Sequence, residues 1–368
     1  MEVFQSEIMS LKCVDADLGK ACADTCQVKI DECLEFCDDP NCNSRCQGQW
    51  LDCLAACPCY SGCPDGCENC PNPICQGPSE HLFIIDVRME EFNKGMHWNS
   101  DTGEVEFRNF DYQVNQGFDI EDSCYAMMNG EHWLLGGWFN PDAVAKIENC
   151  QISRQASTLE FPFHGGIFGS CASFRNKIYT CFDGRENRTR ECITFDGKTQ
   201  EIAAGQTTRG HDWSDLVVHD DELVTVGGCD GDGENCHGVT EIYGRDDGWV
   251  SHSWADFPVH ELTNHAMVSD SKGIIIITDS SYDNTIYHLD FLPNNVYRWA
   301  TLGQLRESAF NVSATSILGD VFIGYNNLER IRIDEREISA TIVYETGFEL
   351  RLDHAPFLAV DANFCKEE

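Results

Sequence analysis

The chain has 368 residues, 42% of them hydrophobic, which is enough to bury one large core and a smaller second unit. Its formal net charge of −37 excludes the basic surfaces that bind nucleic acids and anionic membranes. No apolar run reaches the roughly 18 residues of a membrane span, so we expect no membrane insertion. The acidic composition favours solubility in a salty extracellular medium, with divalent-cation binding by clustered carboxylates as the alternative.

The 22 cysteines are concentrated near the N-terminus, where fourteen lie between Cys13 and Cys75. Such density is typical of a disulfide scaffold formed in an oxidising compartment. The segment 1–11 has neither a basic start nor an apolar stretch, so it is not a signal peptide. We therefore expect a secreted protein whose leader is absent from this chain. A cytosolic protein that binds metal through its cysteines is the alternative.

After an N-terminal segment, residues 1–20, the region 21–58 contains one cysteine spacing twice. Successive cysteines in each quartet are 4, 7 and 4 residues apart, which places all four on one face of a helix. A turn sequence at 38–41 separates the quartets, so we predict an antiparallel α-hairpin. Four disulfides between the stripes would replace the core that so small a hairpin cannot build, and zinc or copper sites are the alternative. The predicted ladder pairs Cys22 with Cys57, Cys26 with Cys53, Cys33 with Cys46, and Cys37 with Cys42.

Residues 59–78 are predicted to form an irregular, disulfide-linked knot and linker, because glycine and proline prevent a helix. Sequence alone does not assign partners to the other cysteines of the N-terminal region, which are Cys13, Cys59, Cys63, Cys67, Cys70 and Cys75. The region 20–75 resembles the cysteine-rich heads of secreted invertebrate proteins. In those heads, helical Cys-x3-Cys pairs precede a Cys-Pro-Cys and Cys-Pro-x-Gly-Cys tail. The resemblance implies an extracellular location and no particular activity.

From residue 79 to 368 the pattern changes to short β runs. An apolar strand recurs six times, at 81–87, 131–137, 177–184, 222–228, 272–278 and 320–325. The ends of these strands are 50, 47, 44, 50 and 47 residues apart, a period that suits four-stranded propeller blades. We therefore predict a mainly β fold: a six-bladed β-propeller preceded by the small disulfide-laddered α-hairpin.

Each apolar strand has similar neighbours. A strand of small residues precedes it at 123–128, 170–174, 215–219, 265–269 and 312–317. Two more strands follow, most clearly at 285–291 and 296–302 in the fifth copy and at 329–334 and 338–344 in the sixth. The first copy lacks a preceding strand. We predict that 354–360, which resembles 265–269, supplies it and closes the ring, so that no sheet edge stays open.

Glycine pairs follow the apolar strand in the second and fourth copies, at 136–137 and 227–228, with Tyr243 and Trp249 downstream in the fourth. This arrangement resembles the kelch repeat. The other copies lack the pair, so the array is a degenerate kelch-like one. The resemblance implies that the loop after the second strand and the loop leading into the next blade share one face of the propeller.

The long loops after the second strands are the expected binding face. They carry the candidate contact residues Trp138, Phe139, Asp183, Arg185 and Arg188. Cysteines bracket two of these loops, so we expect Cys181 to pair with Cys192 and Cys229 with Cys236. Cys124 and Cys171 occupy matching places in adjacent blades and are candidates for pairing, whereas Cys150 and Cys365 have no assigned partner. Asn187 and Asn311 begin Asn-x-Ser/Thr triplets, the form of a glycosylation acceptor.

Two sets of residues could bind metals. Asp230, Asp232 and Glu234 alternate with glycines, so their oxygens could converge on Ca²⁺, although a solvated turn clipped by a disulfide is the interpretation we favour. Four histidines near the starts of blades could bind copper or zinc, although isolated loop histidines are more often plain surface residues. These histidines are His164, His211, His260 and His265.

No phosphate-binding loop, nucleophile elbow or zinc-protease motif is present in the sequence. Neither the copper site of galactose-oxidase-like enzymes nor a correctly phased sialidase Asp-box is visible. We therefore expect a secreted binding or scaffolding protein that uses its propeller to bind an extracellular protein or glycan, with self-assembly into matrix or filaments as an extension. The alternative is an extracellular glycan-directed hydrolase or oxidase.

Overall fold

The computed structural model divides the chain into two units, Met1–Ser79 and Glu80–Glu368, and describes residues of the second. The predicted segments 1–20, 21–58 and 59–78 lie outside the described residues, as do Asp232, His260 and Asn311. The described residues are 81–85, 94–100, 102–109, 111–112, 122–148, 150–155, 157–165, 170–231, 233–244, 248–253, 255–258, 261–270, 272–279, 284–292, 296–306, 312–317, 319–325, 327–334, 337–345, 357–360 and 364–365.

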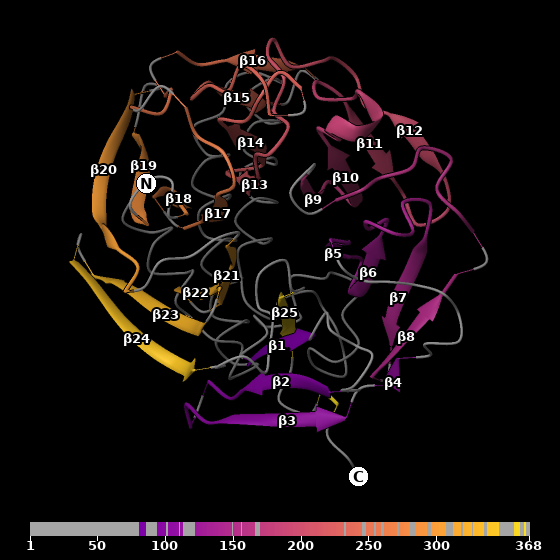
Figure 1. The fold of residues 1–368 in the computed structure, drawn as a ribbon, viewed down its shortest axis with the longest axis vertical. Coiled ribbons are helices and arrows are strands. Elements are labelled where there is room, and N and C mark those ends of the chain that lie inside the picture. Colours follow the sequence, from indigo (N-terminus) through magenta and orange to yellow (C-terminus); the bar gives the residue numbers. More distant parts are fainter. Residues whose placement is uncertain are drawn as a thin grey trace, which may run out of the picture. The chain divides into compact units, whose positions relative to one another are not determined.

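Six sheets of four or five strands stand in a ring, as the repeat period predicted (Figure 1). Blade I contains β25 (Phe357–Val360), β1 (His81–Ile85), β2 (Lys94–Trp98) and β3 (Val105–Asn109). Blade II contains β5 (Cys124–Met128), β6 (Glu131–Leu135), β7 (Val144–Glu148), β8 (Gln151–Arg154) and β4 (Asp111–Tyr112). Blade III contains β9 (Ser170–Phe174), β10 (Lys177–Cys181), β11 (Cys192–Phe195) and β12 (Gln200–Ile202).

The remaining three blades follow the same order from the inner to the outer strand. Blade IV contains β13 (Leu216–His219), β14 (Glu222–Val226), β15 (Thr240–Tyr243) and β16 (Trp249–Ser251). Blade V contains β17 (Ala266–Ser269), β18 (Gly273–Ile277), β19 (Thr285–Leu292) and β20 (Val296–Gln304). Blade VI contains β21 (Ser313–Ile317), β22 (Asp320–Gly324), β23 (Asn327–Asp334) and β24 (Glu337–Glu345).

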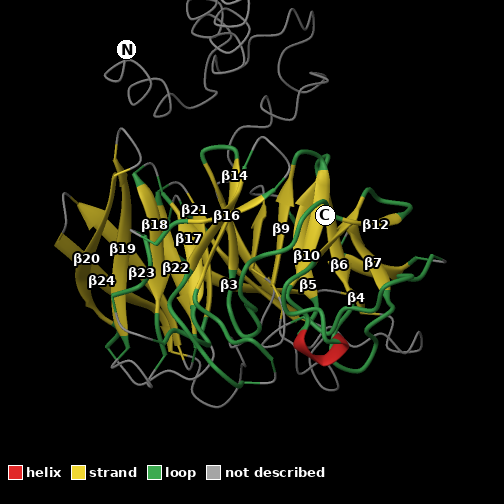
Figure 2. Cartoon of the chain, turned by 90° about the horizontal axis from the view of Figure 1, so that it is seen from above, coloured by secondary structure: helices red, strands yellow, loops and turns green. Residues whose placement is uncertain are grey.

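Loops gather at one end of the blades, where the short 3-10 helix η5 (Gly184–Glu186) also lies (Figure 2). Within the described ranges, no helix has the length and apolar character needed to cross a membrane. The six sheets confirm the predicted architecture, a six-bladed propeller.

The C-terminal strand closes the ring, as predicted. Strand β25 pairs antiparallel with β1, so residues from the end of the chain provide the innermost strand of the first blade. The disulfide Cys150–Cys365 links the region between β7 and β8 to the segment that follows β25. A second disulfide, Cys124–Cys171, joins the inner strands of blades II and III. Covalent bonds thus reinforce the ring near the place where it closes.

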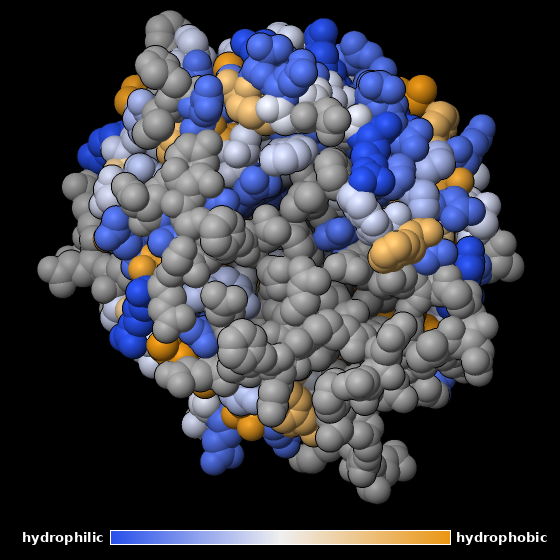
Figure 3. All heavy atoms as spheres, viewed as in Figure 1, coloured by the Kyte–Doolittle hydropathy of each residue, from blue (hydrophilic) through white to orange (hydrophobic). Residues whose placement is uncertain are grey.

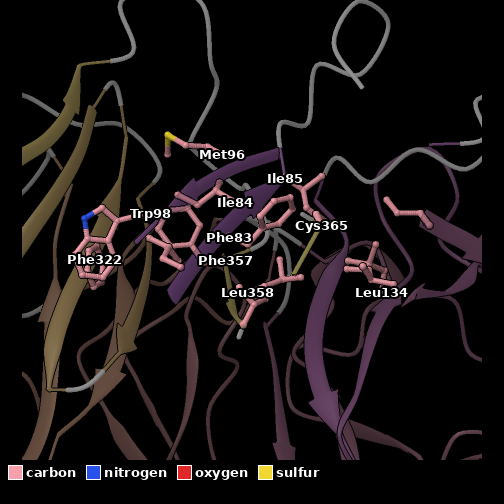
Figure 4. Close-up of a cluster of buried hydrophobic side chains, with 14 of the residues drawn as sticks. Phe83, Ile84, Ile85, Met96, Trp98, Leu134, Phe322, Phe357, Leu358 and Cys365 are labelled. Atoms are coloured by element: carbon pink, nitrogen blue, oxygen red, sulfur yellow. The ribbon is translucent and has the colours of Figure 1, made fainter. Parts of the chain in front are cut away.

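The second strands of the blades carry the core. All five residues of β1, β18 and β22 are buried, because blades pack against both faces of each strand. Figure 4 shows Phe83, Leu134 and Phe322 in one cluster, contributed by blades I, II and VI. Trp98 packs on Phe322 with ring centroids 4.6 Å apart, which joins the first blade to the last.

The second strands end slightly earlier than predicted. Strand β14 stops at Val226, because Gly227 and Gly228 adopt positive φ angles of 77° and 95°. A Cβ atom at Gly227 would lie 2.5 Å from the Leu262 carbonyl oxygen. The glycine pair therefore lets the loop after the strand approach the loop leading into the next blade. The short strand β4, parallel to β8 at the edge of blade II, was not predicted.

Candidate binding face on blades II to IV

Two disulfides close the loops predicted to form the binding face. Cys181 and Cys192 are cross-strand partners on β10 and β11, and the bond between them closes the loop 182–191 at its base. A second disulfide joins Cys229 to Cys236 within the loop after β14. Each bond holds the ends of a long loop together, so the side chains between them are presented on a restrained backbone.

Asp183 ties together two loops of blade III. Its side chain is 2% exposed, and its Oδ2 atom accepts a hydrogen bond of 2.9 Å from the backbone N–H of His164. The His164 Nδ1 atom lies 3.3 Å from the same oxygen. Arg188 approaches Asp183 at 3.6 Å and donates to the Pro162 carbonyl. The predicted contact residues Asp183 and Arg188 therefore act mainly as the framework of the face.

Phe139 and Arg185 are exposed on this face, and Trp138 is half-buried beside them. The guanidinium carbon of Arg185, on η5 of blade III, lies 3.4 Å from the centroid of the Trp138 ring, in the loop after β6 of blade II. Phe139 is 64% exposed, the highest value among the exposed large hydrophobic residues that the structure describes. Arginine and large aromatic side chains are the types that most often dominate binding energy at recognition surfaces.

The face continues from blade III to blade IV through Thr189. Its hydroxyl donates to the Asp230 carbonyl oxygen at 3.2 Å, and its own carbonyl accepts from the His211 N–H at 2.7 Å. In Figure 3, which views the same side as Figure 1, hydrophilic side chains predominate over these two blades, with isolated apolar residues between them. The loops of blades II to IV thus form one connected polar surface around the Trp138–Arg185 pair.

Beneath this surface lies a buried acid–base pair. The His211 Nε2 atom is 2.8 Å from Glu241 Oε2, and both side chains are 0% exposed. Glu241 also accepts from the backbone N–H groups of Thr208, at 2.8 Å, and Arg209, at 3.2 Å. Burial tends to raise the pKa of Glu241, but the hydrogen bonds from His211 and Thr208 outweigh it and hold the pKa below its usual value. Because this pair does not reach the solvent, its role is to anchor the loop that contains residues 207–211.

His237 packs edge-on against His211, with ring centroids 5.3 Å apart, and its Nε2 atom lies 2.7 Å from the Gly210 carbonyl oxygen. Burial, followed by the proximity of His211, lowers the pKa of His237 to about 4. Burial likewise lowers the pKa of His265 to about 3. Both histidines are therefore neutral at pH 7 and belong to the interior.

Asp230, a candidate calcium ligand, is already engaged by Arg209. The guanidinium donates to both carboxylate oxygens, at 2.7 and 3.0 Å, and the Gly210 N–H donates to one of them at 2.9 Å. Glu234 is exposed. Across the described residues, no group of three His, Cys, Asp or Glu side chains is arranged to hold a metal ion. The calcium hypothesis, which includes Asp232, stays a prediction.

Sequence reasoning named His211 but missed Glu241 and His237. A signal for Glu241 was present, because it interrupts β15, a strand whose four residues are all buried. A carboxylate in such a strand needs a partner, and a histidine is the natural one. The candidate glycosylation site Asn187 lies exposed at the end of η5, where it adopts a φ of 56°.

Comparison with known proteins adds a fold likeness alone. No known protein family matches the chain, and no curated protein sequence matches it either. A solved structure titled "Structure of YjhT" is similar, with 10% sequence identity over 60% of this chain and 97% of that chain, and a TM-score of 0.46. At this level of similarity no function transfers, so the interpretation rests on the residues of the face itself.

Proposed function

We propose that this protein is a secreted, disulfide-rich binding protein whose loop face on blades II to IV holds an extracellular protein or glycan. The observation that carries the proposal is the stacking of Arg185 on Trp138 beside the exposed Phe139. These side chains come from loops of two blades, so the propeller itself fixes their spacing. A rigid aromatic surface loses little conformational entropy on binding.

Disulfide chemistry supports the extracellular assignment. The eight cysteines in the described part of the chain form four disulfides. Such bonds persist in oxidising compartments and are rare in the cytosol. The kelch-like character of the repeats and glycosylation at Asn187 belong to the same proposal. So does an N-terminal hairpin that serves as a spacer or second contact site in matrix or filament assembly.

The test compares binding by matched variants of the full chain with its disulfides intact. Wild type, Trp138→Ala and Phe139→Ala are applied to a glycan array and to affinity capture from extracellular extract. The control is Ile202→Ala, which removes a side chain of similar exposure, 59%, on the outer strand β12. Because aromatic side chains at the centre of an interface often dominate its energy, we expect each loop variant to weaken binding by about tenfold or more.

Equal binding by the loop variants and wild type would overturn the proposal. A glycan that is turned over without stable binding would instead favour the hydrolase or oxidase alternative. That alternative stays a prediction, and the pair His211 and Glu241 beneath the face is completely buried.

A further inference from the structure

A small polar hollow lies on the outer strands of blade VI, away from the loops considered above. It encloses about 70 Å³ and is lined by Arg330 and Arg332 of β23 and by Ser339 and Thr341 of β24. The strand register pairs Arg330 with Thr341 and Arg332 with Ser339. Side chains two residues apart stand on the same face of a strand, so the four form one square set of donors.

A buried carboxylate holds the two arginines. Asp320 on β22 is 6% exposed, and its oxygens accept hydrogen bonds from Arg330 Nε at 2.7 Å and from Arg332 Nε at 3.0 Å. The guanidinium of Arg330 also lies 5.3 Å from the Trp98 ring centroid, which restricts its position further. Two guanidinium groups on one carboxylate give this trio a formal charge of +1, within a chain of net charge −37.

The exposure of the lining suits a ligand that arrives from solvent. The Arg332 side chain is 55% exposed and that of Arg330 is 29% exposed, while both hydroxyl residues are exposed. Arg306 lies against the opposite face of the hairpin and does not line the hollow, since its Nη2 donates to the carbonyl oxygen of Ala340, a residue packed in the core with Ile331. Arg306 also lies 4.0 Å from Glu329, so its charge is partly balanced.

We propose that this hollow is a binding site for a tetrahedral oxyanion, and that its ligand is the sulfate or phosphate ester of a glycan. Guanidinium forks and hydroxyl groups are the donors that recognise such oxygens. A volume of 70 Å³ has room for a few water molecules and hence for one oxyanion. Ser339 and Thr341 are both exposed, so an oxyanion carried on a larger molecule can reach the hollow. The site does not depend on the loop face of blades II to IV.

The test measures binding of the full chain to a sulfated oligosaccharide, to the same oligosaccharide after desulfation, and to inorganic sulfate and phosphate as competitors. Wild type is expected to bind the sulfated form with an affinity that falls as salt rises. Loss of one charge-assisted contact in Arg332→Gln should weaken binding by about tenfold, with Arg330 left to pair with Asp320. The matched control is Arg298→Gln, because Arg298 is a 47% exposed arginine on β20 that pairs with Asp290.

Each outcome either supports or overturns the proposed oxyanion site. Selective loss in Arg332→Gln, with binding retained in Arg298→Gln and in Trp138→Ala, supports the site and separates it from the loop face. Efficient displacement by free sulfate or phosphate would also support an oxyanion site, and would identify the free ion as its ligand. Equal binding of the desulfated oligosaccharide, or equal loss in Arg298→Gln, would overturn it. If Arg332→Gln does not fold, the double variant Ser339→Ala/Thr341→Val carries the same test.

Discussion

Blades III and IV have short outer strands and long loops, whereas blades V and VI have long outer strands. The third and fourth strands of blades III and IV have only three or four residues each, and their long loops are closed by disulfides. The corresponding strands of blades V and VI have eight or nine residues. No cysteine occurs between Cys236 and Cys365. One propeller therefore builds a braced loop face on one side and long outer hairpins on the other.

The two long hairpins share an irregularity that the short ones lack. The register of β19 with β20 shifts between Ile286 and Tyr287, and that of β23 with β24 shifts between Leu328 and Glu329. A bulge near the start of a long hairpin increases its twist and re-aims the outer strand. The two sites that we propose follow this division: one lies in loops, at Trp138, and the other lies on a strand face, at Arg330.

The largest expected effect comes from the disulfide that spans the ring closure. Because the bond between Cys150 and Cys365 spans 215 residues, its removal by a double Ser substitution should lower the unfolding free energy by about 5 kcal/mol. Removing Cys229–Cys236, which spans 7 residues, should cost about 2–3 kcal/mol. Denaturant unfolding of both variants and wild type measures the difference. Equal losses would contradict the view that closure depends on the long bond.

Breaking the buried pair beneath the loop face should cost nearly as much. In Glu241→Ala, His211 and two backbone N–H groups lose their acceptor inside the protein, so we expect a loss of about 3–5 kcal/mol in unfolding free energy. The control is Glu201→Ala, because Glu201 forms an exposed pair with Lys177 that should contribute less than about 1 kcal/mol. Similar values for the two variants, measured by denaturant unfolding, would show that the network does not anchor the loops.

Acid should act oppositely on two histidines, His237 in blade IV and His288 in blade V. Burial and the nearby His211 lower the pKa of His237 in blade IV to about 4, so the stability it preserves at neutral pH is lost as the pH falls below about 6.5. Burial opposes protonation of His288 in blade V, but contacts with Asp270 and Asp290 outweigh it and raise the pKa of His288. The contribution of His288 is therefore present below pH 6.5 and lost as the pH rises through its folded-state pKa.

Denaturant midpoints at pH 5, 6.5 and 8 test this contrast. His237→Asn should reduce the loss of stability on acidification, whereas His288→Asn should lower stability more at pH 5 than at pH 8. Shifts of the same sign in both variants would refute the contrast between the two histidines.

The smallest change in stability is expected at the exposed part of the binding face. Arg185 lies on the surface above Trp138, so Arg185→Ala should change the unfolding free energy by less than about 0.5 kcal/mol. Its effect on ligand binding should be much larger, which thermal unfolding and binding assays on the same sample can separate. A large loss of stability without loss of binding would make Arg185 a structural residue.

The regular spacing of the six apolar strands made the propeller fold predictable from the sequence. Six strands in phase determine the number of blades, and the likeness of residues 354–360 to 265–269 identified the closing strand, whose described part pairs with β1. The partner of Cys150 could not be predicted, because pairing depends on which loops the closed ring brings together. The strand β4 has two residues and no periodicity, so only its parallel contact with β8 makes it a strand.

The binding face was predictable as a set of loops, whereas the role of each residue in it was not. Asp183 and Arg188 were predicted to be contact residues because they lie in a long loop after a second strand. The structure shows them bonded to His164 and Pro162, a relation between distant segments that no local pattern encodes. Trp138 and Arg185 were proposed separately, and only the ring geometry places them together.

The most direct test of the proposed binding face is the hydrogen-exchange footprint of the full chain with and without its captured extracellular ligand. Binding at the face should slow exchange in the loops 136–143 and 182–191, and leave the outer strands of blades V and VI unchanged. Trp138→Ala should lose this protection, while Ile202→Ala should keep it. Protection confined to other surfaces, with the two loops exchanging as in the free protein, would contradict the account.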